Sequence, residues 1–129
     1  MGRRHLTFQE AVAALGRGRQ VEQWLGTEEI DGGATALLWL SASPVGSSFR
    51  LVRHRVRDVG TQDFTDVAVF PPVDRAEEFG EGKIVGEAHD AVELLDQAAL
   101  QGAQPDRWVN QSVVQDEYQE ARRERQAGP

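Results

Sequence analysis

The chain has 129 residues, of which 40% are hydrophobic and 27% charged, and its formal net charge is −7. This composition is typical of one soluble globular domain, and the absence of cysteine excludes disulfides, thiolate catalysis and cysteine-ligated metal centres. The longest apolar run, residues 34–40, falls far short of the roughly 20 residues that span a membrane. We therefore expect a single cytoplasmic domain over residues 1–129, with no membrane contact and a frayed tail at 122–129.

A short amphipathic helix is predicted near the N-terminus. Thr7 and Glu10 have the spacing of a capping box, and Gly16 and Gly18 end the helix after about two turns. The apolar side chains on one face are Phe8, Ala11, Val12 and Leu15. Because so short a helix is marginal in water, we expect it to pack on a sheet.

The middle of the chain predicts that sheet. Residues 21–30 fit a helix or a strand, and Asp31-Gly32 favours a two-residue hairpin turn. Residues 34–42 are apolar on both alternations, which indicates a central strand buried on two sides. The composition of residues 43–46 predicts a turn.

Three further strands complete the predicted sheet. Residues 49–58 form the first, and Gly60 ends it. Residues 64–70 form the second, which Pro71-Pro72 ends because proline cannot donate to the ladder. After an acidic loop at 73–82, residues 83–87 add a short edge strand.

The C-terminal third predicts helices. Asp90 and Glu93 repeat the capping spacing before a helix that closes near Gly102, and a last segment begins at Pro105. The predicted fold class is α+β: a single domain with a four- to five-stranded antiparallel meander sheet, packed on one face by the N-terminal and C-terminal helices.

Positive charge is concentrated in one predicted strand, although the chain is acidic. Residues 1–57 carry +3 and residues 58–96 carry −9. Because side chains alternate across a strand, Arg53, Arg55 and Arg57 form a row on the face opposite Val52 and Val56. This arginine row has two interpretations: pairs with neighbouring acids such as those at 63 and 66, or a site for an anion or an acidic partner.

The acidic loop is the complementary candidate surface. Glu77, Glu78 and Glu81 lie close together there and are predicted either to be solvated or to dock a basic partner. In the second case the chain would act as an acidic inhibitor of a basic enzyme. The acidic balance of the whole chain argues against nucleic acid as the ligand of the arginine row.

A small-molecule site is the alternative prediction. His54, Trp24, Trp108 and Asn110 are the candidates to line a cavity between sheet and helices. No serine elbow, Walker motif or dinucleotide fingerprint is present, and no metal ligands have recognisable spacing. We therefore expect no catalytic residues, metal or cofactor, and favour a module that binds a protein partner or self-associates over an enzyme.

Overall fold

The computed structural model describes residues 5–59, 70–71, 73, 82–111 and 113–127. The elements follow one another as α1 (Phe8–Gly16), β1 (Val21–Glu29), a 3-10 turn (Asp31–Gly33), β2 (Thr35–Val45), β3 (Ser48–Arg57), β4 (Lys83–Ala88), α2 (Ala91–Ala99), β5 (Val109–Asn110) and α3 (Val114–Ala127). Helix α3 thus covers most of the predicted tail at 122–129.

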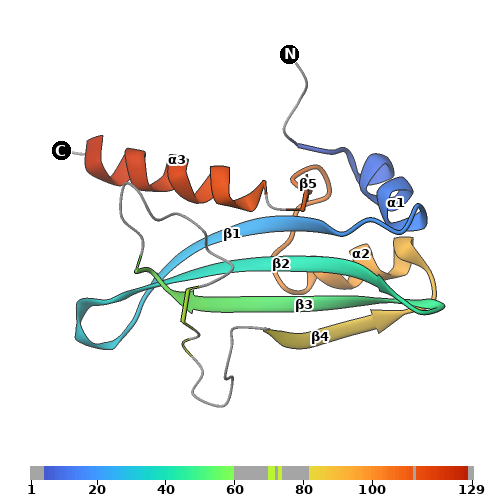
Figure 1. The fold of residues 1–129 in the computed structure, drawn as a ribbon, viewed down its shortest axis with the longest axis horizontal. Coiled ribbons are helices and arrows are strands. Elements are labelled where there is room, and N and C mark those ends of the chain that lie inside the picture. The colour runs from blue at the N-terminus through green and yellow to red at the C-terminus, as the bar shows by residue number, and fades with distance from the viewer. Residues whose placement is uncertain (1–4, 60–69, 72, 74–81, 112, 128–129) are drawn as a thin grey trace.

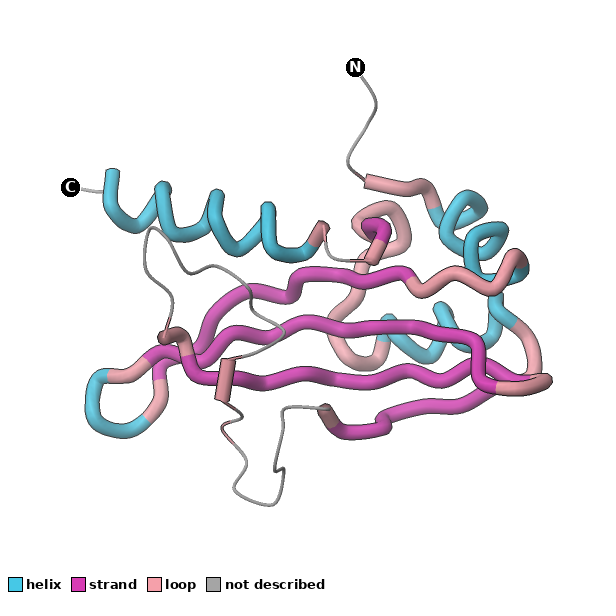
Figure 2. Tube along the Cα trace, viewed as in Figure 1, coloured by secondary structure: helices cyan, strands magenta, loops and turns pink. Residues whose placement is uncertain are grey.

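The strands form one antiparallel sheet of five, in the order β4-β3-β2-β1-β5 (Figures 1 and 2). β1, β2 and β3 form two consecutive hairpins. β4 pairs with the outer side of β3, and the short β5 pairs with the outer side of β1. The α+β fold class and the antiparallel meander are therefore confirmed. The ambiguous stretch at 21–30 is a strand, because it pairs with β2 over residues 21–29.

The first hairpin turns where the sequence predicts it, although its form differs. The 3-10 turn replaces the two-residue loop that we expected, and Gly32 and Gly33 both adopt positive φ, 80° and 77°. The backbone N–H of Ile30 donates to the carbonyl of Ala34 at 3.0 Å and closes this turn.

The prediction of a turn at residues 43–46 is wrong. β2 continues to Val45, which pairs with Ser48, so the chain reverses at residues 46–47. Pro44 is tolerated inside β2 because β1 ends its pairing at Ala42. Past that point one side of β2 is an edge, where a missing backbone donor costs no ladder hydrogen bond.

Helices cover both faces of the sheet, so the prediction of a single covered face is wrong. Leu40 and Ala42 of β2 belong to a first core, built with residues of α1 and α2. Leu37 and Trp39 of the same strand belong to a second core, built with Val114 and Tyr118 of α3. Because side chains alternate along a strand, the two cores lie on opposite faces. α1 and α2 lie near one end of the sheet, and α3 runs along β1 toward the other end (Figure 1).

Both predicted helix starts are confirmed. The backbone N–H of Glu10 donates to Thr7 Oγ1 at 3.1 Å, and the Glu10 carboxylate accepts from the N–H of Thr7 at 2.9 Å. Asp90 accepts from the N–H groups of Val92 and Glu93 at 2.7 and 3.3 Å. Each cap satisfies donors that the first helical turn leaves without a partner.

The predicted strand at 64–70 lies outside the described residues, except for its last residue. Phe70 is buried in the second core, and its ring meets that of Tyr118 edge to face at 5.6 Å. Beyond it, the N–H of Arg57 donates to the carbonyl of Pro71 at 2.8 Å, and the N–H of Val73 donates to the carbonyl of Arg55 at 3.1 Å. The outer edge of β3 is therefore paired with β4 at one end and bonded to Pro71 and Val73 at the other.

Candidate functional site: a cationic face on the sheet

The arginine row lies on the same face of the sheet as the first core and begins at its margin, because Arg53 lies directly opposite Leu40 of that core. Leu51 precedes the row on this face and is fully buried with α1 and α2. Arg53 and Arg55 are half-buried and Arg57 is exposed, so exposure increases along the row. The arginines thus stand at the end of the sheet that α1 and α2 leave uncovered.

The row has one acidic partner among the residues that the structure describes. The guanidinium of Arg55 contacts the carboxylate of Glu28, which reaches it from β1 across β2. Within the described residues, Arg53 and Arg57 make no ion pair. The acids proposed as partners at 63 and 66 lie outside the described residues. The interpretation of the row as internally paired therefore holds for Arg55.

Lys83 joins the row through the register of the edge strand. It lies directly opposite Arg53, and directly opposite residues of an antiparallel pair share a face. We call Arg53, Arg55, Arg57 and Lys83 the cationic face. Sequence reasoning placed Lys83 on an edge strand but did not place it beside the arginines. The sequence feature that points to this position of Lys83 is Gly86, because a glycine within a strand often marks a bulge, which shifts the register.

A bulge in β4 produces this register. Gly86 pairs with Leu51, but the next described pair is Ile84 with Val52, so Val85 is the extra residue. Without that residue the register would place Ile84 opposite Arg53 and Lys83 opposite His54. The bulge thus moves the lysine from one face of the sheet to the other.

His54, a predicted ligand-binding residue, lies on the opposite face of β3. Its Nε2 is 2.9 Å from Ser41 Oγ, and its ring stacks on Trp39 with centroids 4.7 Å apart and an interplanar angle of 11°. These contacts attach the imidazole to β2. They give His54 a packing role on the face that also carries the second core.

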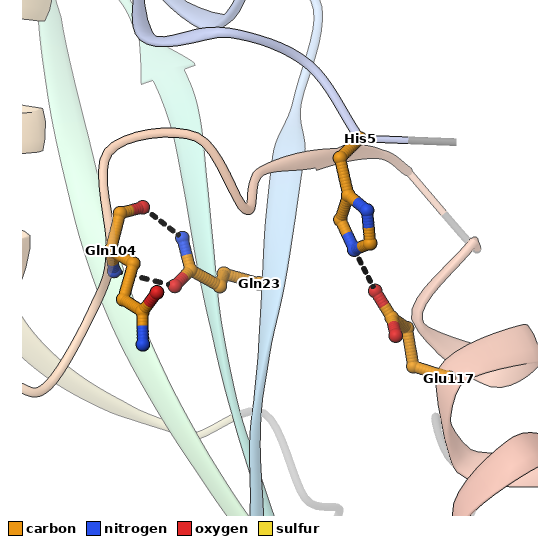
Figure 3. Close-up of polar contacts among 4 residues, drawn as sticks. All are labelled: His5, Gln23, Gln104 and Glu117. Atoms are coloured by element: carbon orange, nitrogen blue, oxygen red, sulfur yellow. Dashed lines mark hydrogen bonds and ion pairs between the residues drawn. The ribbon is translucent and has the colours of Figure 1, made fainter. Parts of the chain in front are cut away.

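A small cleft lies between β1, the segment that follows α2, and α3. Figure 3 shows the polar contacts among four of the residues that line it. His5 Nε2 is 2.8 Å from Glu117 Oε1 at this seam. Gln23 is 2% exposed, and its side-chain amide bonds both backbone groups of Gln104: its Nε2 donates to the carbonyl at 3.0 Å, and its Oε1 accepts from the N–H at 2.7 Å. Trp24 and Arg107 also line the cleft.

The cleft is a weaker candidate than the cationic face. Its volume is about 190 Å³, whereas ligand pockets usually measure about 300–1,000 Å³. The amide of Gln23 is already occupied by the backbone, and His5 and Glu117 bond each other. These contacts hold the N-terminal segment, the loop and α3 against β1, which is a structural role.

The four predicted ligand-binding residues are not brought together. Of them, Trp24 lines the cleft. Trp108 is 1% exposed in the first core, and Asn110 is exposed in β5 opposite Val21. A small-molecule function stays a prediction. The predicted partner-binding acids of the loop, Glu77, Glu78 and Glu81, lie outside the described residues.

The described residues contain no group of three or more histidine or acidic side chains placed to hold a metal ion. None of the described helices is long and apolar enough to cross a membrane.

Comparisons with known proteins do not extend this description. No protein-family model, curated protein or solved structure matches the chain.

Proposed function

We propose that the chain is a protein-binding module whose cationic face contacts an acidic, extended segment of a partner protein. The observation that carries this proposal is the arginine row: three guanidinium groups on one sheet face, with a single acidic partner among the described residues, in a chain of net charge −7. Guanidinium forks suit carboxylates, which they bind through paired hydrogen bonds.

The geometry of the row favours an extended ligand. Alternate residues of a strand are about 6.6–6.8 Å apart, which is also the spacing of alternate side chains in an extended peptide. A segment with an acidic residue at every second position, laid along β3, would therefore meet each arginine in turn. The strand pairing fixes the backbone at these positions, so the spacing of the arginines along β3 is set before the ligand binds.

The test uses a labelled peptide of alternating glutamate and serine, with fluorescence anisotropy as the readout. The double variant Arg53→Glu/Arg57→Glu leaves the contact between Arg55 and Glu28 in place. We expect it to weaken binding at least tenfold, because each reversal replaces an attraction by a repulsion.

The matched control is Arg17→Glu/Arg19→Glu, which makes the same change in net charge at two exposed arginines after α1. It should change the affinity less than threefold. Equal losses in the two variants would show that overall charge, and not the cationic face, governs binding. Circular dichroism of each variant checks the fold, and sedimentation of the wild type shows whether a second copy competes for this face.

A further inference from the structure

The cross-strand pair of Arg53 and Lys83 is the most unusual feature of the cationic face. Directly opposite residues of an antiparallel pair have Cβ atoms about 4.5–5.5 Å apart, and like charges at such positions destabilise a sheet. Within the described residues, no acidic group pairs with either side chain. The fold therefore keeps two adjacent positive charges on one surface.

The bulge at Val85 shows that this pair is built into the fold and does not follow from the strand pattern alone. It turns Lys83 onto the arginine face, whereas an unbulged register would place the uncharged Ile84 beside Arg53. Gly82 then holds the entry to β4 close to β3, because a Cβ at this position would lie 3.0 Å from the carbonyl oxygen of Arg53. Bulges commonly re-aim a side chain next to a functional site.

The charges of the pair identify the class of group that would bind there. Two adjacent cations are neutralised by one dianion, whereas a carboxylate leaves an excess positive charge. A phosphoryl group on a side chain carries about −1.5 to −2 charges at pH 7 and three acceptor oxygens. Arginine binds such a group as a planar fork and lysine binds it as a point charge, so the two side chains are complementary.

We propose that Arg53 and Lys83 together form a clamp for a phosphoryl group on the partner's acidic segment. This proposal rests on the proposed function for the identity of the partner. Arg55 is held by Glu28, and Arg57 extends the surface for the neighbouring acidic residues of the same segment.

The test compares two peptides of alternating glutamate and serine that differ at one central position, glutamate or phosphoserine. The wild-type chain should bind the phosphopeptide at least tenfold more tightly. Lys83→Gln should lower the affinity for the phosphopeptide at least threefold more than the affinity for the glutamate peptide, which reduces this preference to less than threefold. Lys83→Arg keeps the charge and should retain the preference, and Arg19→Gln is the matched control away from the sheet.

Several outcomes would overturn the clamp. One is equal affinity of the wild type for both peptides, which leaves the proposed function standing if both bind. Another is a preference that persists in Lys83→Gln. Tighter binding of a single-stranded oligonucleotide than of the phosphopeptide would overturn the assignment to a protein partner. Inorganic phosphate that binds as tightly as the phosphopeptide would support the clamp and assign it to free phosphate. A wild-type chain that binds neither peptide would refute the proposed function itself.

Discussion

Gly82 is the residue whose replacement the structure forbids most clearly. Its φ is +85°, and a Cβ there would lie 2.5 Å from Val52 Cγ1 and 2.9 Å from His54 Nδ1. Gly18 has nearly the same φ, +84°, but its Cβ would meet no atom within 4 Å. The two glycines therefore separate the cost of backbone conformation from the cost of crowding.

We expect Gly18→Ala to lower the free energy of unfolding by about 1–2 kcal/mol, the usual cost of a left-handed alanine. Gly82→Ala should cost at least about 1 kcal/mol more, because the added methyl group also displaces neighbours of β3. Urea denaturation of both variants measures the difference. Equal losses would contradict the close approach of Gly82 to β3.

At the scale of elements, α3 depends on a different core from α1 and α2. Its attachment includes a hydrogen bond from the hydroxyl of Tyr118 to Asp58 Oδ1 at 2.5 Å, just after β3. Tyr118 is fully buried and its ring lies 6.2 Å from that of Trp24. Because the two cores lie on opposite faces, loosening one helix should leave the helices on the other face in place.

Tyr118→Phe removes the hydroxyl and keeps the ring. We expect backbone amides in α3 to exchange at least tenfold faster, since a hydrogen bond to a charged group contributes about 1.5–3 kcal/mol. Amides in α1 and α2 should change less than threefold in the same hydrogen-exchange experiment. Asp90→Ala, which removes the cap of α2, should accelerate exchange in α2 and change exchange in α3 less than threefold. Uniform acceleration in both variants would show that the helices open together.

Local patterns in the sequence predicted most of the elements, because their causes are local. The capping residues Thr7 and Asp90 bond to their own helices, so spacing alone reveals them. The turn expected at 43–46 failed because Pro44 is acceptable only where β2 has lost its neighbour, which is a property of the sheet.

The candidate site was predictable in part for the same reason. Alternation along one strand placed the three arginines on one face. The positions of Lys83 and Glu28 depend on register between strands, and a bulge of one residue reverses the face without any strong pattern in the sequence.

At the scale of the whole molecule, β4 is the outermost of the described strands on its side of the sheet, and its residues limit pairing with other chains. Lys83 is exposed at its start, and the bulge at Val85 interrupts its regular pairing. Charged residues and bulges are features that discourage edge-to-edge association. Ile84 is nonetheless 51% exposed, so this edge keeps an apolar side chain in contact with water.

Lys83→Val should therefore shift the chain toward larger species in sedimentation velocity at high protein concentration. Lys83→Gln, which keeps a polar side chain at this position, is the control and should sediment like the wild type. A Lys83→Val variant with an unchanged sedimentation profile would show that the lysine has no part in protecting the edge.

The pairing of β5 with β1 has a consequence for how the protein is made. Val21 meets Asn110, and the carbonyl of Trp108 accepts from the N–H of Leu6 at 2.7 Å, so partners at opposite ends of the sequence complete the sheet. During synthesis, β1 and β2 can pair early, but the outer side of β1 has to wait for residues that leave the ribosome much later. A nascent chain stalled before that point would expose an unfinished strand, and this is the form that chaperones would meet.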